Sequence, residues 1–209
     1  MGILEKLLQM KASVSCITSL FGREQRHEFN NSVFSCDIIQ YIIITDQNLS
    51  YNHKNSTCIK IEKKEYNKLL LNIDFWRLIK STHTLIYDTN ISFFKQLDPI
   101  YFDYDFVAGC RPAQEIRDIQ RAFNTPFLPI IGSSILSLRK TKLMLDILSY
   151  KKTYKNSIIT NREDIYTSLA CYTQYKKLPP TDIADAFCYE RGWMPNTFAG
   201  LKKNVIITK

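Results

Sequence analysis

An acid and an amide follow an apolar run in the segment HTLIYDTNISFF, residues 83–94. The residues before Asp88 are largely apolar, β-branched or aromatic, which is typical of a strand covered on both faces of a parallel sheet. Open α/β sheets bind their ligands beyond the carboxyl ends of the strands. The side-chain oxygens of Asp88 and Asn90 are therefore placed to hold a divalent cation or a sugar. The alternative is a turn in which one of these side chains caps its own backbone.

Polar side chains also lie at the ends of two earlier strands, predicted from the apolar segments 14–22 and 38–48. They are Thr18, Ser19, Arg23 and Asp46. Glu163 and Asp164 form a further polar group, at the start of a predicted helix. If the sheet gathers these groups beside Asp88, one acid can bind a hard cation while another accepts a proton. Helix caps and turns use the same residue types, so the joint position at strand ends is the main evidence for a site.

Strands and helices alternate along the first half of the chain. Apolar residues at helical spacing predict one amphipathic helix over residues 63–80, between a short strand at 57–62 and the strand that ends at Asp88. In the second half we expect a strand that turns into a helix over 135–150, and a helix over 161–175. This order predicts an α/β fold with a Rossmann-like mixed, mostly parallel sheet flanked by helices.

The composition predicts one soluble, cytoplasmic domain. The chain has 209 residues, which can bury a full core, and 45% of them are hydrophobic. No apolar run is long enough to cross a bilayer, and the first residues lack the pattern of a signal peptide. The six cysteines and three histidines are scattered, which argues against a metal site built from nitrogen or sulfur. The abundance of Lys, Asn and Ile suits an AT-rich genome, such as that of a virus.

The chain is basic, with a formal net charge of +8. A positive field favours anionic partners, including nucleic acids, acidic membrane surfaces and phosphorylated small molecules. The basic residues are spread along the sequence in short clusters such as RKTK at 139–142. A nucleic-acid-binding domain usually concentrates them on one element, so a solvated, lysine-rich surface is the preferred interpretation.

Several segments resemble, in sequence and in order, a family of glycosyltransferase-like domains that is catalogued mainly as of unknown function. The segments are EYNKLLLNIDFW, TLIYDTN, YDFVAG, IGSSILSLRKTKLMLDIL, REDIYTS and KLPPTDIADAFCYE. The resemblance covers roughly residues 62–200, and REDIYTS and LPPTDIA are its most specific parts. It implies a glycosyltransferase of type A fold that binds a nucleotide-diphosphate sugar.

The resemblance also implies a metal. In such enzymes an Asp-x-Asp motif at a strand end holds Mn²⁺ or Mg²⁺ against the donor's diphosphate, and the matching segment here is Asp88-Thr89-Asn90. Asn90 can ligate through its carbonyl oxygen but supplies no charge, so we expect weaker metal binding. Relatives carry a histidine near the segment TFAGLKKN, which has none. Lys202 or Lys203 could neutralise the diphosphate in place of a metal.

Further roles follow from the same resemblance. Glu163 and Asp164 match an acidic pair that supplies the general base, so we expect Asp164 to accept the proton of the acceptor hydroxyl and Glu163 to orient it. This predicts direct displacement with inversion, although retention stays open. The alternative is that both acids only favour a helix start. The donor contacts expected in addition to the strand-end residues are Tyr66, Asn67, Gly132, Ser133 and Ser134.

Together these observations predict one glycosyltransferase domain, with a nucleotide-binding half at 1–90 and an acceptor and catalytic half at 91–209. It would transfer a sugar from a nucleotide-diphosphate donor to a glycan or protein acceptor in glycan biosynthesis. One alternative is a basic nucleic-acid-binding protein, which would bind oligonucleotides in a salt-sensitive way. A second is a catalytically degenerate transferase fold that acts as a binding module, suggested by the missing second aspartate.

Overall fold

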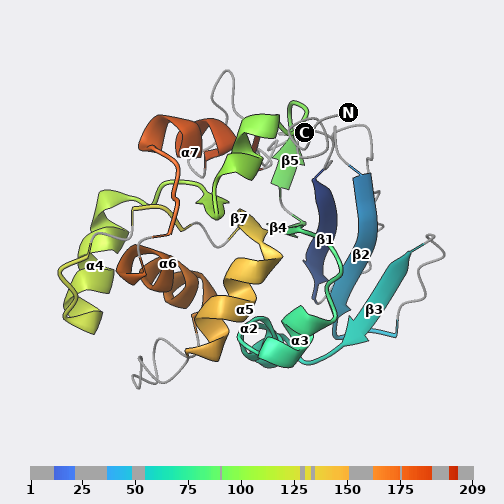
Figure 1. The fold of residues 1–209 in the computed structure, drawn as a ribbon. Helices are drawn as coiled ribbons and strands as arrows, with labels where there is room; N and C mark the ends of the chain where they lie inside the picture. Colours follow the sequence, from blue (N-terminus) through green and yellow to red (C-terminus); the bar gives the residue numbers. More distant parts are fainter. Residues whose placement is uncertain are drawn as a thin grey trace, which may run out of the picture.

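A six-stranded sheet forms the centre of the computed structural model (Figure 1). The structure describes residues 12–21, 37–48, 55–89, 91–127, 130–132, 135–150, 162–174, 176–189 and 198–201. The strands lie in the order β3-β2-β1-β4-β7-β6. Their bounds are β1 Ser13–Leu20, β2 Asp37–Thr45, β3 Ser56–Lys60, β4 His83–Asp88, β6 Phe106–Ala108 and β7 Leu136–Lys140. β1, β2, β3 and β4 pair in parallel, whereas β7 is antiparallel to both of its neighbours. The predicted mixed, mostly parallel sheet is confirmed.

The strand order reverses between β1 and β4. From β1 the chain moves outward through β2 to β3 and then returns to the other side of β1 as β4. Neighbouring strands that lead away in opposite directions define a topological switch point, where open α/β sheets bind ligands. At the carboxyl ends of these strands, Ser19 is the register partner of Asp88.

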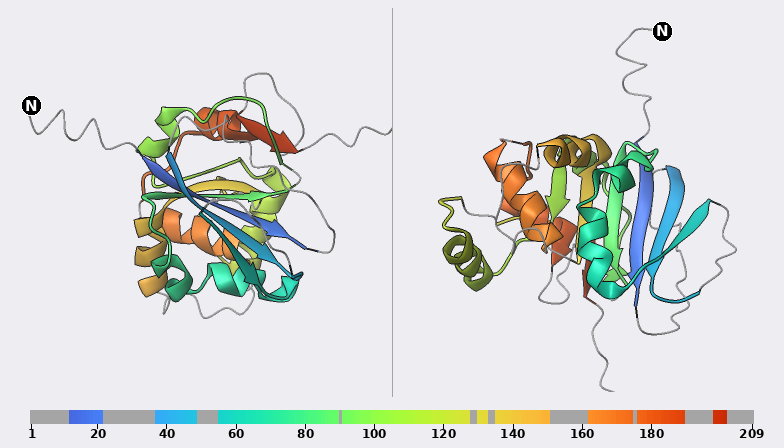
Figure 2. Two further views of the ribbon diagram at one scale, coloured as in Figure 1. Left: turned by 90° about the vertical axis from the view of Figure 1, so that its right-hand side faces the viewer. Right: turned by 90° about the horizontal axis from the view of Figure 1, so that it is seen from below.

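Helices cover one face of the sheet, which we call the helical face (Figure 2). They are α2 Tyr66–Leu70, α3 Ile73–Arg77, α5 Thr141–Ser149 and α6 Glu163–Thr173, with α4 Ala113–Phe123 beyond α6. Ile17 and Ile86 from the sheet pack in one core with Trp76 of α3, Met144 of α5 and Leu169 of α6. The apolar alternation of β1 and β4 therefore fixes which of their polar residues also face these helices.

The other face, which we call the aromatic face, is covered by a 3-10 helix, a short helix and a small second sheet. These are η3 Pro99–Asp103, α7 Thr181–Phe187, and the sheet β5-β9-β8, formed by Ile91–Phe93, Ala199–Leu201 and Cys188–Tyr189. Tyr101 meets Phe187 with ring centroids 5.0 Å apart, and Phe187 stacks on Phe198 at 5.6 Å. Aromatic packing thus fills this side of the sheet.

The single helix predicted over residues 63–80 is wrong, because the segment divides into η2 Lys63–Glu65, α2 and α3. α2 ends at Leu70, and the side chain of Asn72 accepts a hydrogen bond from the Asp74 N–H at 2.9 Å, capping α3. Trp76 is fully buried and donates from Nε1 to the Leu70 carbonyl at 2.7 Å, which stabilises the interruption between α2 and α3. Local capping by Asn competes with a continuous helix.

The second half of the chain matches its prediction more closely. β7 leads directly into α5, and α6 begins at Glu163. Arg162 occupies the N-cap position of α6. Within the described part of the chain, no helix has the length and apolar character needed to span a membrane.

Candidate functional site

The switch point places Ser19 and Asp88 side by side on the helical face. Both residues are partly buried, and they share this face with Ile17 and Ile86 because strand side chains alternate. The hydroxyl of Tyr66 of α2 lies close enough to the side chains of Ser19 and Asp88 for both to shift its pKa. Two hydroxyl groups and one carboxyl group therefore converge where the strand order reverses.

Tyr66 links this group to the acidic start of α6. Burial raises the pKa of the Tyr66 hydroxyl, and the negative charges of Glu163 and Asp88 raise it further, while Arg139 and the Ser19 side chain lower it in part. The net shift is upward, so the hydroxyl stays protonated at neutral pH. A protonated hydroxyl beside acids can donate a hydrogen bond to an anionic ligand oxygen.

Glu163 is held in a buried ion pair with Arg139 of β7. Both guanidinium nitrogens of the fork donate to its carboxylate, the contact from Nη2 to Oε2 measuring 3.2 Å. Thr167 Oγ1 donates to Glu163 Oε1 at 2.8 Å, and Arg139 Nε donates to Ser137 Oγ at 2.9 Å. Arg139 and Glu163 are 2% and 4% exposed. The carboxylate of Glu163 is thus fixed in place and its oxygens are occupied.

The carboxylate of Asp164 contacts two other arginines. Arg111 Nη2 donates to its Oδ2 at 3.0 Å, and Arg162 donates to both of its oxygens at 3.2 Å. Burial alone would raise the pKa of Asp164, but the charges and hydrogen bonds of Arg111 and Arg162 hold it below its usual value. The Arg111 side chain is buried, whereas that of Arg162 is 48% exposed. Asp164 is therefore ionised, and one of its two cationic partners lies within reach of solvent.

Gly132 allows Arg111 to take this position. Its φ of 153° lies in a region that side chains disfavour, and a Cβ at this residue would stand 2.8 Å from both Arg111 Nη2 and Ser168 Cβ. Gly132 was expected to lie against the donor sugar; the structure places it against Arg111 and Ser168. Ser133 and Ser134 lie outside the described residues.

The structure separates the remaining predicted residues. Thr18 points to the aromatic face, where its Oγ1 is buried without a hydrogen-bond partner among the described residues. Asp46 is exposed at the end of β2, one strand away from Ser19, and Asn67 lies next to Tyr66 on α2. Other predicted residues lie outside the described residues: Arg23, Asn90, Lys202 and Lys203.

Sequence reasoning missed both buried arginines. Arg139 belongs to the RKTK cluster that predicted a solvated surface, and this interpretation is wrong for Arg139, which pairs with Glu163. Its place at the end of the apolar segment ILSL was the available clue, because a charge inside a buried strand needs a partner. Arg111 follows the apolar segment FVAGC in the same way.

The described residues supply little for a metal ion on their own. They contain no group of three or more His, Cys, Asp or Glu side chains arranged to hold one. Asp88 offers a carboxylate, while the carboxylate of Glu163 is occupied by Arg139. Mg²⁺ commonly binds through one or two carboxylates together with substrate phosphates. Asp88 therefore fits a cation whose other ligands come mainly from a diphosphate and water.

Fold and site together define an α/β protein with a polar cluster at the topological switch point of its sheet. The chain belongs to the DUF5672 family, described as a protein of unknown function, whose model matches residues 49–200. The matched region includes Tyr66, Asp88, Arg111, Arg139 and the acidic pair, and it begins after β1 and β2. No match was found among curated proteins.

Proposed function

We propose that the protein is a glycosyltransferase that moves a sugar from a nucleotide-diphosphate donor to a hydroxyl group of a glycan or protein. The observation that carries this proposal is the pairing of Ser19 with Asp88 at the switch point, beneath Tyr66. Sheets with this reversal bind nucleotides in the crevice beyond their carboxyl ends. The acids at the start of α6 supply the second requirement, a proton acceptor.

The donor diphosphate would bind at Ser19, Tyr66 and Asp88. The hydroxyl groups of Ser19 and Tyr66 can donate to phosphate oxygens, but the carboxylate of Asp88 would repel them. Asp88, with Asn90 as the second proposed ligand, would instead hold Mn²⁺ or Mg²⁺. Such a cation, when bound, stabilises the negative charge that the leaving nucleoside diphosphate gains.

Asp164 would act as the base. The acceptor oxygen attacks the anomeric carbon, its proton passes to the Asp164 carboxylate, and the bond to the diphosphate breaks, which inverts the anomeric centre. Arg111 and Arg162 keep Asp164 ionised but make it a weaker base. Loss of the contact from the half-exposed Arg162 on acceptor binding would bring the pKa of Asp164 back toward its ordinary value. Glu163, fixed by Arg139, is proposed as a positioning residue.

The first test is a panel of uridine, guanosine, adenosine and thymidine diphosphate sugars, each with and without Mn²⁺. We expect one nucleotide family to stabilise the protein by about 2.7 kcal/mol at a hundred times its dissociation constant. Donor hydrolysis should need Mn²⁺ and fall about 100-fold or more in Asp88→Asn. Asp74→Asn removes an exposed acid of α3 and is the matched control. Asp164→Asn should still bind the donor but not transfer the sugar.

A second candidate function is a binding module without turnover. The specific observation in its favour is that both acids of α6 are neutralised by arginines. Donor stabilisation without hydrolysis or transfer, with any metal or acceptor, would support this candidate over the enzyme. If no donor stabilises the protein, both proposals fail, and salt-sensitive binding of an oligonucleotide would then support nucleic-acid binding.

A further inference from the structure

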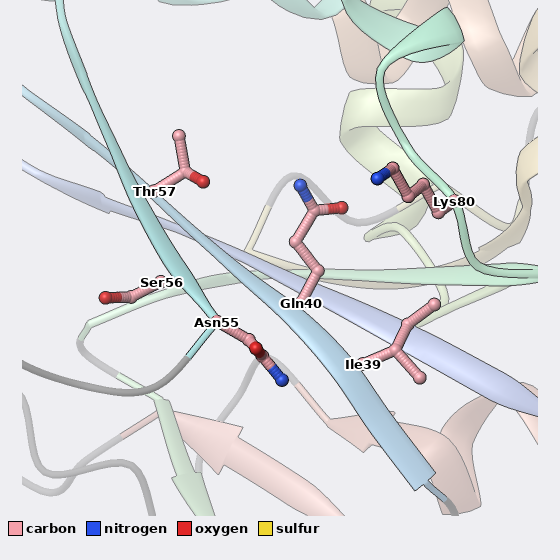
Figure 3. Close-up of a pocket in the computed structure, with 6 residues that line it drawn as sticks. All are labelled: Ile39, Gln40, Asn55, Ser56, Thr57 and Lys80. Atoms are coloured by element: carbon pink, nitrogen blue, oxygen red, sulfur yellow. The ribbon is translucent and has the colours of Figure 1, made fainter.

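A pocket of about 300 Å³ opens on the sheet away from the switch point (Figure 3). It is lined by Ile39, Gln40, Asn55, Ser56, Thr57 and Lys80. Two of these residues lie in the first half of β2, three lie just before or at the start of β3, and Lys80 lies just before β4. Ser19 and Asp88, in contrast, lie at the carboxyl ends of their strands. The pocket is thus separate from the proposed donor site.

Three polar side chains converge on this pocket from different elements. Gln40 shares the helical face with Ile42, and Thr57 is the register partner of Ile42 on β3. Figure 3 shows Gln40 and Thr57 directed into the space that the Lys80 amine enters from the segment after α3. Ser56 points the other way, as strand alternation requires. The pocket therefore presents an amide, a hydroxyl and an ammonium group to one ligand.

Hydrogen bonds to the neighbouring strands hold the polar lining residues in place. The fully buried Ser15 donates from Oγ to Gln40 Oε1 at 3.3 Å, which turns the amide N–H groups of Gln40 away from that contact. Asn55 has a φ of 68°, and its carbonyl accepts a hydrogen bond from Tyr41 N–H at 3.0 Å. The start of β3 is thereby anchored to β2, with Thr57 in a set position. Fixed donors lose less entropy on binding than mobile ones.

The charge of the pocket favours an anion. Among the described residues of the lining, Lys80 alone carries a charge, and no described side chain forms an ion pair or hydrogen bond with its amine. No described residue of the lining carries a carboxylate, and the volume of the pocket is near the lower end of the range of about 300–1,000 Å³ found for small-molecule sites. We infer that the pocket binds a monosaccharide-sized anion, a sugar that carries a phosphate or carboxylate group. The anionic group binds Lys80, and the hydroxyl groups bind Gln40 and Thr57.

Titration calorimetry on the full chain tests this inference with glucose 6-phosphate, glucuronate, glucose and inorganic phosphate. We expect at least one of the two sugar anions to bind with a Kd of about 1 mM or tighter, about tenfold or more tighter than glucose or inorganic phosphate. Glucose 6-phosphate alone identifies a phosphate ligand, and glucuronate alone identifies a carboxylate ligand. Equal binding of all four probes, or binding of none, overturns the inference.

Variants locate the binding. Lys80→Met should weaken the binding of the sugar anion about tenfold or more, because a charge-assisted hydrogen bond is lost. Lys142→Met removes the same charge from exposed α5 and should leave the Kd within about twofold. Gln40→Glu has nearly the same shape and should abolish anion binding while leaving the fold intact.

The donor site is tested apart from the pocket by Asp88→Asn, which should keep the affinity of the sugar anion unchanged. Equal losses in Lys80→Met and Lys142→Met would show that only the general positive field attracts the ligand, and would overturn the inference. A loss in Asp88→Asn would place the ligand at the switch point instead, with the same consequence.

Discussion

The helical and aromatic faces of the sheet both pack through apolar cores, but they differ in the charges that they bury. On the side of α6, Glu163 pairs with Arg139 and Asp164 pairs with Arg111, and all four residues are buried. Among the described residues, these are the two salt bridges in which both partners are buried, and both lie on the helical face. The core of the aromatic face is held instead by rings such as those of Tyr101, Phe187 and Phe198.

This difference distinguishes packing that stabilises the fold from buried charges that add little stability. Apolar rings contribute stability when buried, whereas a buried ion pair seldom stabilises more than apolar residues of the same volume would. The aromatic face is therefore explained by stability alone. The ion pairs of α6 add little stability relative to an apolar core, so stability alone does not explain why these charges are buried.

The largest effect is expected when one partner of the Arg139–Glu163 pair is removed. Arg139→Met leaves Glu163 charged and buried, so unfolding free energy should fall by about 3–5 kcal/mol in urea denaturation. The double variant Arg139→Met/Glu163→Met should recover most of that loss. Phe187→Leu on the aromatic face should cost only about 1–2 kcal/mol. A single Arg139→Met variant as stable as wild type would contradict the contrast.

The two faces should also respond to acid in different pH ranges. Burial, with a smaller effect of Lys140, lowers the pKa of His83, on the aromatic face, to about 4. The unfolded chain then binds more protons below its ordinary histidine pKa of about 6.5, so stability falls by about 3 kcal/mol as the pH drops from about 6.5 to about 4. Below that range this contribution is constant.

Asp164 should affect stability only at a more acidic pH than His83 does. Its pKa is lowered in the folded state, so its stabilising contribution is complete above the ordinary aspartate pKa of about 3.9 and is lost as the pH falls further. Urea denaturation at several pH values should show that His83→Gln removes the slope between about pH 6.5 and 4, whereas Asp164→Asn alters only the more acidic range. An unchanged slope in His83→Gln would contradict this assignment.

A smaller effect is expected from Gly132→Ala. The added Cβ meets Arg111 and Ser168 at 2.8 Å, and φ is unfavourable for alanine, so we expect a loss of about 1–3 kcal/mol in unfolding free energy. Adding Ser168→Gly removes one of the two contacts and should restore part of the loss. Equal stability of Gly132→Ala and wild type would show that the space between Gly132, Arg111 and Ser168 is not tightly packed.

The sequence was sufficient to predict the sheet and part of the site. Apolar runs that end in polar residues located β1, β2 and β4, and the rule for strand ends brought Ser19 and Asp88 together. The same period of two also separates Thr18 from Ser19, a distinction that a list of strand-end residues does not make. Tyr66 is the first residue of α2 and follows η2, a division of the segment that helical periodicity did not reveal.

The buried charges could not be predicted because they depend on contacts between distant segments. Arg139 and Glu163 are 24 residues apart, and Arg111 and Asp164 are 53 apart. A basic cluster next to a helix is usually solvated, so RKTK gave no indication that its first residue turns inward while Lys142 stays exposed. The helix break at Asn72 has a local origin instead, since the Asn72 cap and the buried contact of Trp76 with Leu70 favour it.

The smallest effect separates two tyrosines, one on each face. Tyr66→Phe removes a hydroxyl that interacts with the side chain of Ser19, so unfolding free energy should fall by about 0.5–1.5 kcal/mol. Tyr101→Phe is the matched control, since its hydroxyl forms no hydrogen bond with any described residue, and it should change stability by less than about 0.5 kcal/mol. Urea denaturation of both variants measures the difference. Equal effects would mean that the hydroxyl of Tyr66 contributes no more stability than that of Tyr101, and would contradict the assignment of stabilising polar contacts to the helical face.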